Sequence, residues 1–280
     1  MGVNAILEKI VAGKWIAGAT IDDAIDATRK LNKQGIRGII NCLGEEYGRL
    51  DYVDRAVSRY MNLINLIKRA KVGADIAVKL TELGLIIDKG LAERNYAKIV
   101  AFAKKNGVFI WIDMEEEKFV SDSLGIYRRF IKSGNTGVCI QSYLRRSMND
   151  LESLPKGATI RLVKGAYSNS REVAFQTRKE TTDNYYELME YTFKNFWRFT
   201  IATHDSDIIE RARRLNKKYR RDVTYAMLKG IRTKLALELR QKGLKVSVYV
   251  PFGEEWVRYS YRRFKELSTA VLVVRSFIGR

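Results

Sequence analysis

The sequence of 280 residues contains little cysteine, histidine and proline, and it lacks long apolar runs. Its two cysteines, Cys42 and Cys139, lie far apart within apolar segments, which predicts buried free thiols in a reducing compartment. One histidine, His204, and the absence of metal-ligand spacing argue against a zinc site. No apolar run is long enough to span a membrane, and residues 1–15 are too polar for a secretory signal peptide. These absences favour a cytoplasmic protein without a metal site.

The scarcity of proline and glycine also bears on domain organisation. Two prolines and 20 glycines leave little material for a flexible linker, and 46% hydrophobic residues are enough for a sizeable core. We therefore expect a single domain over residues 1–280. Within it we expect an N-terminal helical segment (1–36), a main body (37–267) and an apolar C-terminal tail (268–280).

The formal net charge of +19 limits the classes of partner. A positive excess is typical of proteins that bind nucleic acid, an anionic membrane surface or an anionic ligand. The basic residues are interleaved with acidic ones along the whole chain, and no basic tail, zinc finger or RNA-binding sheet motif is present. We expect no specific nucleic-acid partner, although a basic nucleic-acid-binding protein stays open as an alternative function.

Short β-rich runs alternate with stretches of helical period. Residues from about 5 to 34 read as helical, with Thr20 as a good helix start and Gly35 as a good stop. The expected strands are Arg37–Leu43, Asp75–Leu80, Val108–Met114, Val138–Tyr143, Thr159–Val163, Phe199–Thr203, Asp222–Met227 and Val246–Val250. The expected helices between them are Tyr52–Ala70, Asn95–Lys105, Leu124–Ser133, Arg171–Lys194, Ser206–Tyr219 and Lys229–Gln241, and the connection Arg145–Lys156 is short.

This alternation predicts an α/β protein with parallel strands and crossover helices. About eight such units in about 250 residues is the number found in a (βα)8 TIM-type barrel. An open doubly wound sheet stays an alternative, but no GxGxxG follows any strand, so the usual dinucleotide fingerprint is missing.

In a barrel of this kind the active site forms at the carboxyl ends of the strands, and here those ends are unusually polar. They carry Glu45, Glu46, Lys79, Asp113, Glu115, Glu116, Gln141, Tyr143, Arg161, Lys164, Tyr167, Thr203, His204, Asp205 and Tyr249. Each residue alone has an ordinary explanation, such as a buried ion pair between Lys79 and Asp113 or a solvated acidic loop at 115–117. Burying so many ionisable groups costs stability unless they are paired or bind something. The cluster therefore favours a site for a carboxylate or polyanionic ligand.

The stretch from 249 to 266 (YVPFGEEWVRYSYRRFKE) adds paired arginines to this end of the chain. It reads as a strand that breaks at Pro251 and Gly253 and restarts as a helix, on which Arg258 and Arg262 share one face and Arg263 is adjacent. Neighbouring arginines above a strand end can bind a carboxylate with forked hydrogen bonds, although a solvated basic helix face would show the same pattern.

Several of these segments, in this order, resemble the proline dehydrogenase family of flavin-dependent barrels. They are AVKLTELG, IDMEE, CIQSYLRR, IRLVKGAY, ATHD and the stretch from 249 to 266. RLVKGAY together with YxPxGxxWxxYxxRRxxE is a specific combination. The resemblance implies a distorted (βα)8 barrel that binds FAD non-covalently. It also implies oxidation of L-proline to 1-pyrroline-5-carboxylate by hydride transfer to the flavin N5 atom.

The resemblance also implies a role for each matching residue. Those implied to contact the substrate are Lys79, Leu162, Tyr249, Arg262, Arg263 and Glu266. Those implied to bind FAD are Gln141, Arg161, Lys164, Gly165, Ala166, Thr203 and His204. Those implied to take part in catalysis are Arg161, Lys79, Asp113 and Tyr249. Lys79 and the two arginines would hold the proline carboxylate, Tyr249 and Leu162 would pack on its ring, and Arg161 would lie near N5.

The implied partners are a quinone-type electron acceptor and a separate 1-pyrroline-5-carboxylate dehydrogenase for the next oxidation. The positive net charge would favour peripheral contact with an anionic membrane. Ser168 departs from the family, in which many members have an aromatic residue at this position, so packing on the ribityl chain of the flavin is in doubt. A different enzyme class also stays open, a Schiff-base aldolase-like barrel in which Lys164 is the nucleophile.

Overall fold

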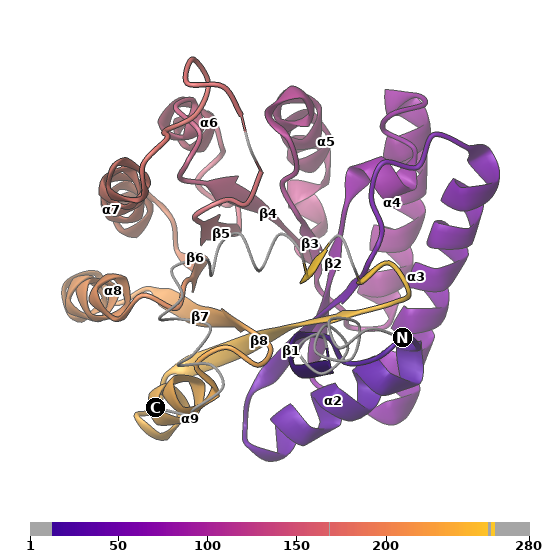
Figure 1. The fold of residues 1–280 in the computed structure, drawn as a ribbon, viewed down its shortest axis with the longest axis horizontal. Helices are drawn as coiled ribbons and strands as arrows, with labels where there is room; N and C mark the ends of the chain where they lie inside the picture. Colours follow the sequence, from indigo (N-terminus) through magenta and orange to yellow (C-terminus); the bar gives the residue numbers. More distant parts are fainter. Residues whose placement is uncertain (1–12, 168, 257–258, 261–280) are drawn as a thin grey trace, which may run out of the picture.

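The computed structural model describes residues 13–167, 169–256 and 259–260, and its strands form a closed parallel barrel ringed by helices (Figure 1). The strands are β1 (Arg37–Cys42), β2 (Ala74–Val78), β3 (Ile110–Ile112), β4 (Thr136–Gln141), β5 (Ile160–Val163), β6 (Arg198–Ala202), β7 (Asp222–Leu228) and β8 (Lys245–Phe252). Each strand pairs with the next in sequence, and β8 pairs with β1, for example Ile39 with Tyr249. The predicted (βα)8 barrel is confirmed, and the open doubly wound sheet is excluded.

The helices follow the strands around the outside of the barrel (Figure 1). They are α2 (Ile21–Lys33), α3 (Leu50–Ala70), α4 (Lys89–Lys105), α5 (Val120–Phe130), α6 (Ser147–Glu152), α7 (Arg178–Asn195), α8 (Ser206–Tyr219) and α9 (Thr233–Gln241). Three short 3-10 turns are η1 (Leu80–Leu83), η2 (Glu117–Phe119) and η3 (Ile131–Ser133). Within the described residues, no helix combines the length and the apolarity that crossing a membrane requires.

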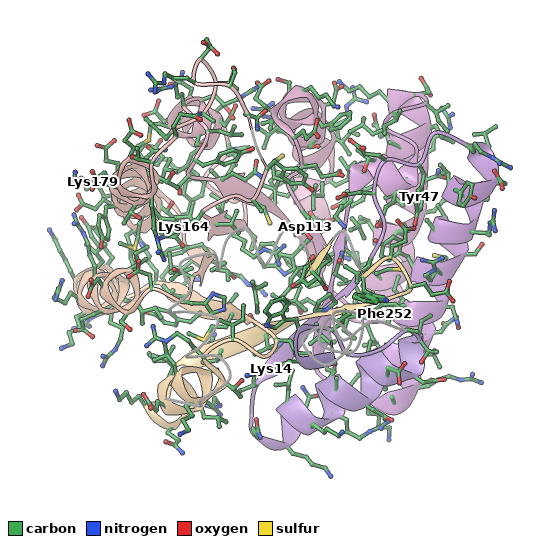
Figure 2. The ribbon with its side chains drawn as sticks, viewed as in Figure 1. Lys14, Tyr47, Asp113, Lys164, Lys179 and Phe252 are labelled. Atoms are coloured by element: carbon green, nitrogen blue, oxygen red, sulfur yellow. The ribbon has the colours of Figure 1, made fainter. Side chains whose placement is uncertain are left out.

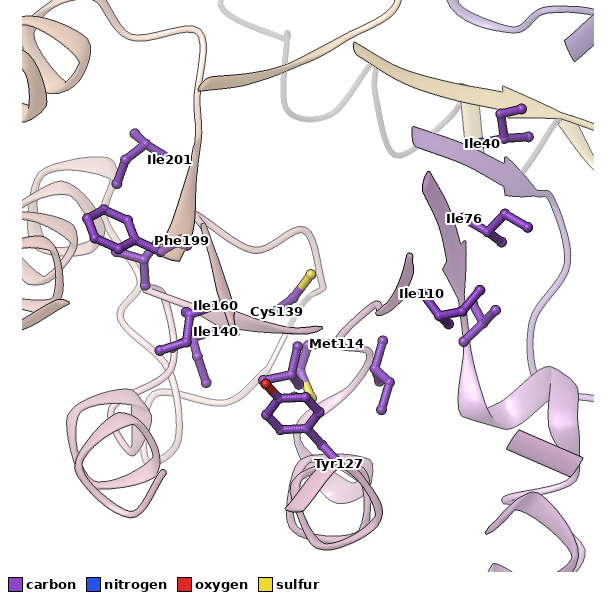
Figure 3. Close-up of a cluster of buried hydrophobic side chains, with 14 of the residues drawn as sticks. Ile40, Ile76, Ile110, Met114, Tyr127, Cys139, Ile140, Ile160, Phe199 and Ile201 are labelled. Carbon is purple, nitrogen blue, oxygen red and sulfur yellow. The ribbon is translucent and has the colours of Figure 1, made fainter. Parts of the chain in front are cut away.

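The core lies between the strands and the surrounding helices. Figure 3 shows isoleucines from adjacent strands, among them Ile40, Ile76 and Ile110, directed outward into this layer. Successive strand residues point to opposite faces, so the residues between them face the barrel interior. Trp111 and Tyr249 belong to that inner layer, with Ile39 and Ala77. Alternation therefore decides which strand residues can reach the mouth of the barrel.

The predicted helix start at Thr20 is confirmed, although residues 16–20 interrupt the helical segment expected from about 5 to 34. Residues 13–15 are helical, 16–20 are not, and α2 begins only after Thr20, whose hydroxyl caps the N–H of Asp23 at 3.2 Å. The interruption has a cause in the barrel, because the N–H of Ala17 donates to the carbonyl of Pro251 at 2.8 Å. The segment therefore lies across the end of β8, while residues 1–12 and the predicted tail 268–280 lie outside the described residues.

Strand β8 continues through Pro251 and ends at Phe252, so the predicted break is absent at Pro251 and present at Gly253. Pro251 is paired with Asn41 of β1, and pairing with β7 ends earlier, at Leu228 and Tyr249. The missing N–H of Pro251 therefore costs no ladder hydrogen bond, because it faces the side where β7 has already ended.

Helix α7 begins at Arg178, whereas the prediction began it at Arg171. Thr177 caps it, accepting from the N–H of Glu180 at 3.2 Å. The residues before it form a loop that returns to the end of β4, since the N–H of Phe175 donates to the carbonyl of Tyr143 at 2.8 Å. This loop is therefore held against the residues that follow β4, where Leu144 and Ala174 form an isolated bridge.

Candidate active site

The carboxyl ends of the strands bring predicted side chains together at one end of the barrel. Cys139 of β4 is paired with Arg161 of β5, so both face the interior with Trp111 and Tyr249. Asp113 follows β3 and joins them; Figure 2 shows it near the centre of the ring of strands. Four separate strands thus supply one compact polar group inside the barrel.

Asp113 is the acceptor at the centre of this group. Its Oδ2 accepts a hydrogen bond of 2.6 Å from the hydroxyl of Tyr249, and its Oδ1 forms an ion pair with Nη2 of Arg161. Cys139 Sγ donates to the same Oδ1 at 3.5 Å. Burial and then the charge of Asp113 raise the pKa of Tyr249 well above its ordinary value, so the phenol stays protonated and acts as the donor.

Arg161 is 3% exposed, and its neighbours fix its plane. Its Nε donates to Cys139 Sγ at 2.9 Å, and its guanidinium carbon lies 5.0 Å from the ring centroid of Trp111 and 5.7 Å from that of Tyr249. Burial raises the pKa of Cys139 to about 12, so this thiol is protonated at neutral pH. Nη1 of Arg161 has no hydrogen-bond partner among the described residues, so the side chain keeps one buried donor for a ligand.

Lys79 lies beside this group at the end of β2 and is buried. Its Nζ donates to the carbonyl of Gly44 at 2.8 Å and lies 3.8 Å from Oε1 of Glu82. Burial alone would lower the pKa of Lys79, but the charges of Glu82, Glu115 and Asp113 outweigh it and raise the pKa above its ordinary value. Lys79 is therefore an ammonium group at the mouth.

Lys164, after β5, pairs with a carboxylate. Its Nζ donates to Thr182 Oγ1 at 3.1 Å and lies 3.3 Å from Oδ2 of Asp205. Burial alone would raise the pKa of Asp205, but Lys164 outweighs it and the pKa is lowered. A Schiff-base nucleophile needs a free amine, whereas this amine is already engaged by Thr182 and Asp205. The arrangement argues against the aldolase-like alternative.

The segment after Lys164 needs a glycine. Gly165 has φ 102°, and a Cβ there would lie 2.1 Å from a ring atom of Tyr143. Ala166 follows it, half-buried, and the hydroxyl of Tyr167 reaches Oε2 of Glu45 at 3.4 Å. The backbone after β5 therefore passes close over Tyr143 and connects to the loop after β1.

Thr203 and His204 lie at the end of β6. The hydroxyl of Thr203 accepts from the N–H of Asp205 at 3.1 Å. Nε2 of His204 accepts from the N–H of Leu228 at 2.9 Å, so this nitrogen carries no proton in the structure. The hydrogen bond joins the imidazole to β7 and leaves Nδ1 as the protonated nitrogen.

Residues 24–274 match the family model described as Proline dehydrogenase. The chain belongs to the proline dehydrogenase family. It is 32% identical over 263 residues to proline dehydrogenase 2 of Bacillus subtilis, covering 92% of this chain and 87% of that protein. It is also 32% identical over 279 residues to proline dehydrogenase of Deinococcus radiodurans, covering 96% and 90%.

Solved structures agree on the fold of this family member. The barrel is similar to part of proline utilization A (PutA) from Bdellovibrio bacteriovorus, with a TM-score of 0.87 and 21% sequence identity. The match covers 97% of this chain and 34% of that one, so the chain spans about a third of PutA. PutA from Corynebacterium freiburgense gives a TM-score of 0.81, also at 21% identity.

Not every residue that the family resemblance suggested reaches the mouth. Leu162 is adjacent to Arg161 on β5 and therefore faces the opposite way, into the core, where its carbonyl accepts from Tyr185 of α7 at 3.0 Å. The structure does not bring its side chain to the site, because strand alternation allows only one of the two inside. Arg262, Arg263 and Glu266 lie outside the described residues, as does Ser168.

The site also contains residues whose place in it was not predicted or was left open by the sequence. Glu115, one of the polar residues expected at the strand ends, is 3% exposed, and its carboxylate accepts from the N–H and the hydroxyl of Thr81, so the alternative of a solvated loop fails for it. Trp111 was not singled out, and Cys139 was predicted only as a buried free thiol. Each lies two residues before a predicted site residue on the same strand or its extension, so each faces the same interior. Nothing in the sequence around Glu82 indicates that this side chain is buried. Its burial depends on α3, which packs over η1.

Proposed function

We propose that the chain is an enzyme that oxidises L-proline to 1-pyrroline-5-carboxylate with FAD as its cofactor. The observation that carries the proposal is the buried group in which Tyr249 and Arg161 both bond to Asp113, with the ammonium of Lys79 beside it. Family membership supplies the reaction class, and this group supplies chemistry suited to a small zwitterionic substrate.

In this proposal the substrate carboxylate binds to Lys79, together with Arg262 and Arg263. Lys79 is held in place by Gly44 and is charged, so it offers an ammonium without first losing other contacts. The ring of Tyr249, fixed by its hydrogen bond to Asp113, forms an apolar wall for the substrate ring. Orientation of this kind supplies a large part of catalysis in a two-substrate reaction.

The substrate nitrogen must lose its proton before its lone pair can assist oxidation. Positive charge on Lys79 and Arg161 lowers the pKa of a neighbouring amine, because like charges disfavour the protonated form. The site therefore needs no strong base beside the amine. His204 is an unsuitable base at Nε2, since that atom already accepts a hydrogen bond from Leu228.

The residues of this chain also fit a flavin. Arg161 Nη1 and Gln141 Oε1 are buried and have no hydrogen-bond partner among the described residues, which suits the polar edge of an isoalloxazine ring. When bound, FAD supplies the acceptor for the hydride that leaves C5 of proline. Lys164, Gly165 and Ala166 on one side and Thr203 and His204 on the other are proposed to hold its ribityl and phosphate chain.

The remaining partners follow from the same reaction. A quinone-type acceptor would take the electrons onward, and a separate dehydrogenase would oxidise the product. The net charge of +19 suits electrostatic approach to an anionic membrane from the cytoplasmic side. Neither partner has a site assigned among the described residues.

The deciding experiment is the visible absorption spectrum of the purified protein supplied with FAD, before and after anaerobic L-proline. Flavin bands that bleach with L-proline, and not with D-proline, would support the proposed enzyme class, the FAD cofactor and the L-proline substrate together. Bound flavin that ignores proline would reject the substrate. A protein that does not retain FAD would reject the proposal as a whole.

A further inference from the structure

A carboxylic acid, Glu82, is buried directly behind Lys79. It belongs to η1, the turn that follows Lys79, and it is 1% exposed. Its Oε2 accepts a hydrogen bond from the hydroxyl of Tyr60 on α3, whereas Oε1, 3.8 Å from Lys79 Nζ, has no hydrogen-bond partner among the described residues. The backbone of Gly44 closes this space, because a Cβ there would lie 3.0 Å from Oε1. Water has little room to solvate this carboxyl.

The groups that face Glu82 come from several elements. Helix α3 contributes Tyr60 and Arg59, and the end of β1 contributes Cys42, which accepts from Nη1 of Arg59 at 2.8 Å. Beyond these, Tyr47 lies in the loop after β1 and Glu115 follows β3. Burial raises the pKa of Glu82 to about 8; Lys79, Tyr60 and Arg59 oppose that rise, and Glu115 adds to it.

We propose that Glu82 is a positioning residue that sets how strongly Lys79 attracts the carboxylate of its ligand. The inference rests on the proposed function, in which Lys79 binds the substrate carboxylate. Ionised Glu82 pairs with the ammonium and cancels its charge, whereas protonated Glu82 leaves that charge to the ligand. The chain therefore binds carboxylates tightly when Glu82 is protonated and weakly when it is ionised.

The contacts of Lys79 are consistent with this effect of Glu82 on its charge. The ammonium group of Lys79 has three N–H donors. One of them donates to the carbonyl of Gly44, which lies in the loop after β1. Glu82 lies at ion-pair distance, and Asp113 contributes to the charge environment of Lys79 from the barrel interior. At an effective dielectric constant of about 20, a negative charge about 7 Å from the ligand weakens its binding roughly 50-fold, and screening reduces this to roughly tenfold.

The test uses cyclopentanecarboxylate, which has the ring and carboxylate of proline but no amine to titrate. Its Kd for the purified, FAD-supplied protein is measured by calorimetry from about pH 6 to about pH 9, where the probe stays ionised. For the wild type we expect the Kd to rise roughly 10- to 50-fold as the pH passes about 8. Glu82→Gln should abolish the rise centred near pH 8 and leave only the smaller change near pH 7 that Glu115 contributes.

Two further variants separate a charge effect from a structural one. Tyr60→Phe removes the hydroxyl that stabilises the carboxylate, so the pH midpoint should move upward while the size of the change is kept. Glu116→Gln is the matched control, because Glu116 pairs with Lys118 near the surface and should leave the profile unchanged. A pH profile that survives Glu82→Gln and disappears in Glu115→Gln would assign the effect to Glu115 and overturn the inference.

Failure of this inference differs from failure of the proposed function. Bleaching of the flavin by proline together with a pH-independent Kd in the wild type overturns the role of Glu82 alone. No bleaching and no binding of the probe at any pH overturn the proposed function and this inference with it.

Discussion

Replacing Asp113 with alanine should destabilise the protein strongly. Asp113 accepts from Tyr249, Arg161 and Cys139, and Arg161 is 3% exposed. Alanine leaves the guanidinium charged and buried without its carboxylate, and breaking a buried pair in this way costs about 3–5 kcal/mol. The phenol of Tyr249 loses its acceptor as well, so the upper part of this range is expected.

A second variant tests whether that cost comes from the unpaired charge. Replacing both partners with apolar residues of similar volume, Asp113→Leu with Arg161→Met, removes the charge together with its counter-charge. Such a swap is often neutral or even stabilising. We therefore expect the double variant to recover most of the stability lost in Asp113→Ala, although it should lose proline-dependent flavin reduction.

The assay is urea unfolding followed by far-ultraviolet circular dichroism, with and without added FAD. Asp113→Leu alone and Arg161→Met alone complete the double-mutant cycle, which isolates the coupling between the two side chains. A loss below about 1 kcal/mol for Asp113→Ala would refute the reasoning, since this is the size of an exposed ion pair. A double variant no more stable than Asp113→Ala would show that packing, not charge, dominates.

Three further predictions concern stability, each measured as a free energy of unfolding in urea. Gly165→Ala should cost about 1–3 kcal/mol, because φ is 102° and the new Cβ would meet Tyr143 at 2.1 Å; an unchanged value would mean that this ring moves freely. Burial raises the pKa of Glu115 from 4.5 to about 7, so its contribution to stability is complete below the unfolded-state pKa and is lost as the pH rises to about 7. Glu115→Gln should therefore remove a decline of about 3 kcal/mol over that interval, and an equally steep decline in the variant would contradict the assignment. Thr20→Ala should cost about 1 kcal/mol by removing the cap on Asp23, with Thr20→Ser as the control that keeps the hydroxyl.

Periodicity was sufficient to predict the barrel, and the rule for strand ends was sufficient to predict its polar mouth. Asp113, Arg161 and Tyr249 could be placed together because parallel strands end on the same side, whichever helices lie between them. Side-chain direction within a strand could also have been read from the sequence, since Leu162 and Arg161 are neighbours and cannot both face the interior. Matching a segment to a family does not apply that alternation, which places the side chain of Leu162 in the core.

Other features depend on contacts between distant segments. The extended residues before α2 lie against Pro251, more than two hundred residues away, which accepts a hydrogen bond from Ala17. The late start of α7 depends on a loop that binds the end of β4. The burial of Glu82 depends on α3, so neither its charge state nor its place beside Lys79 follows from the turn that contains it.

Closure of the barrel by β1 and β8 has a consequence for how the chain is made. Arg37 is paired with Ser247, so the seam that completes the sheet joins opposite ends of the described chain. Contacts of such long sequence separation form late in folding, because the entropy of a large loop is lost before they form. During synthesis β1 exists with one unpaired edge until β8 has left the ribosome, and exposed strand edges promote aggregation. Truncation before residue 245 should therefore give aggregation instead of a smaller folded barrel.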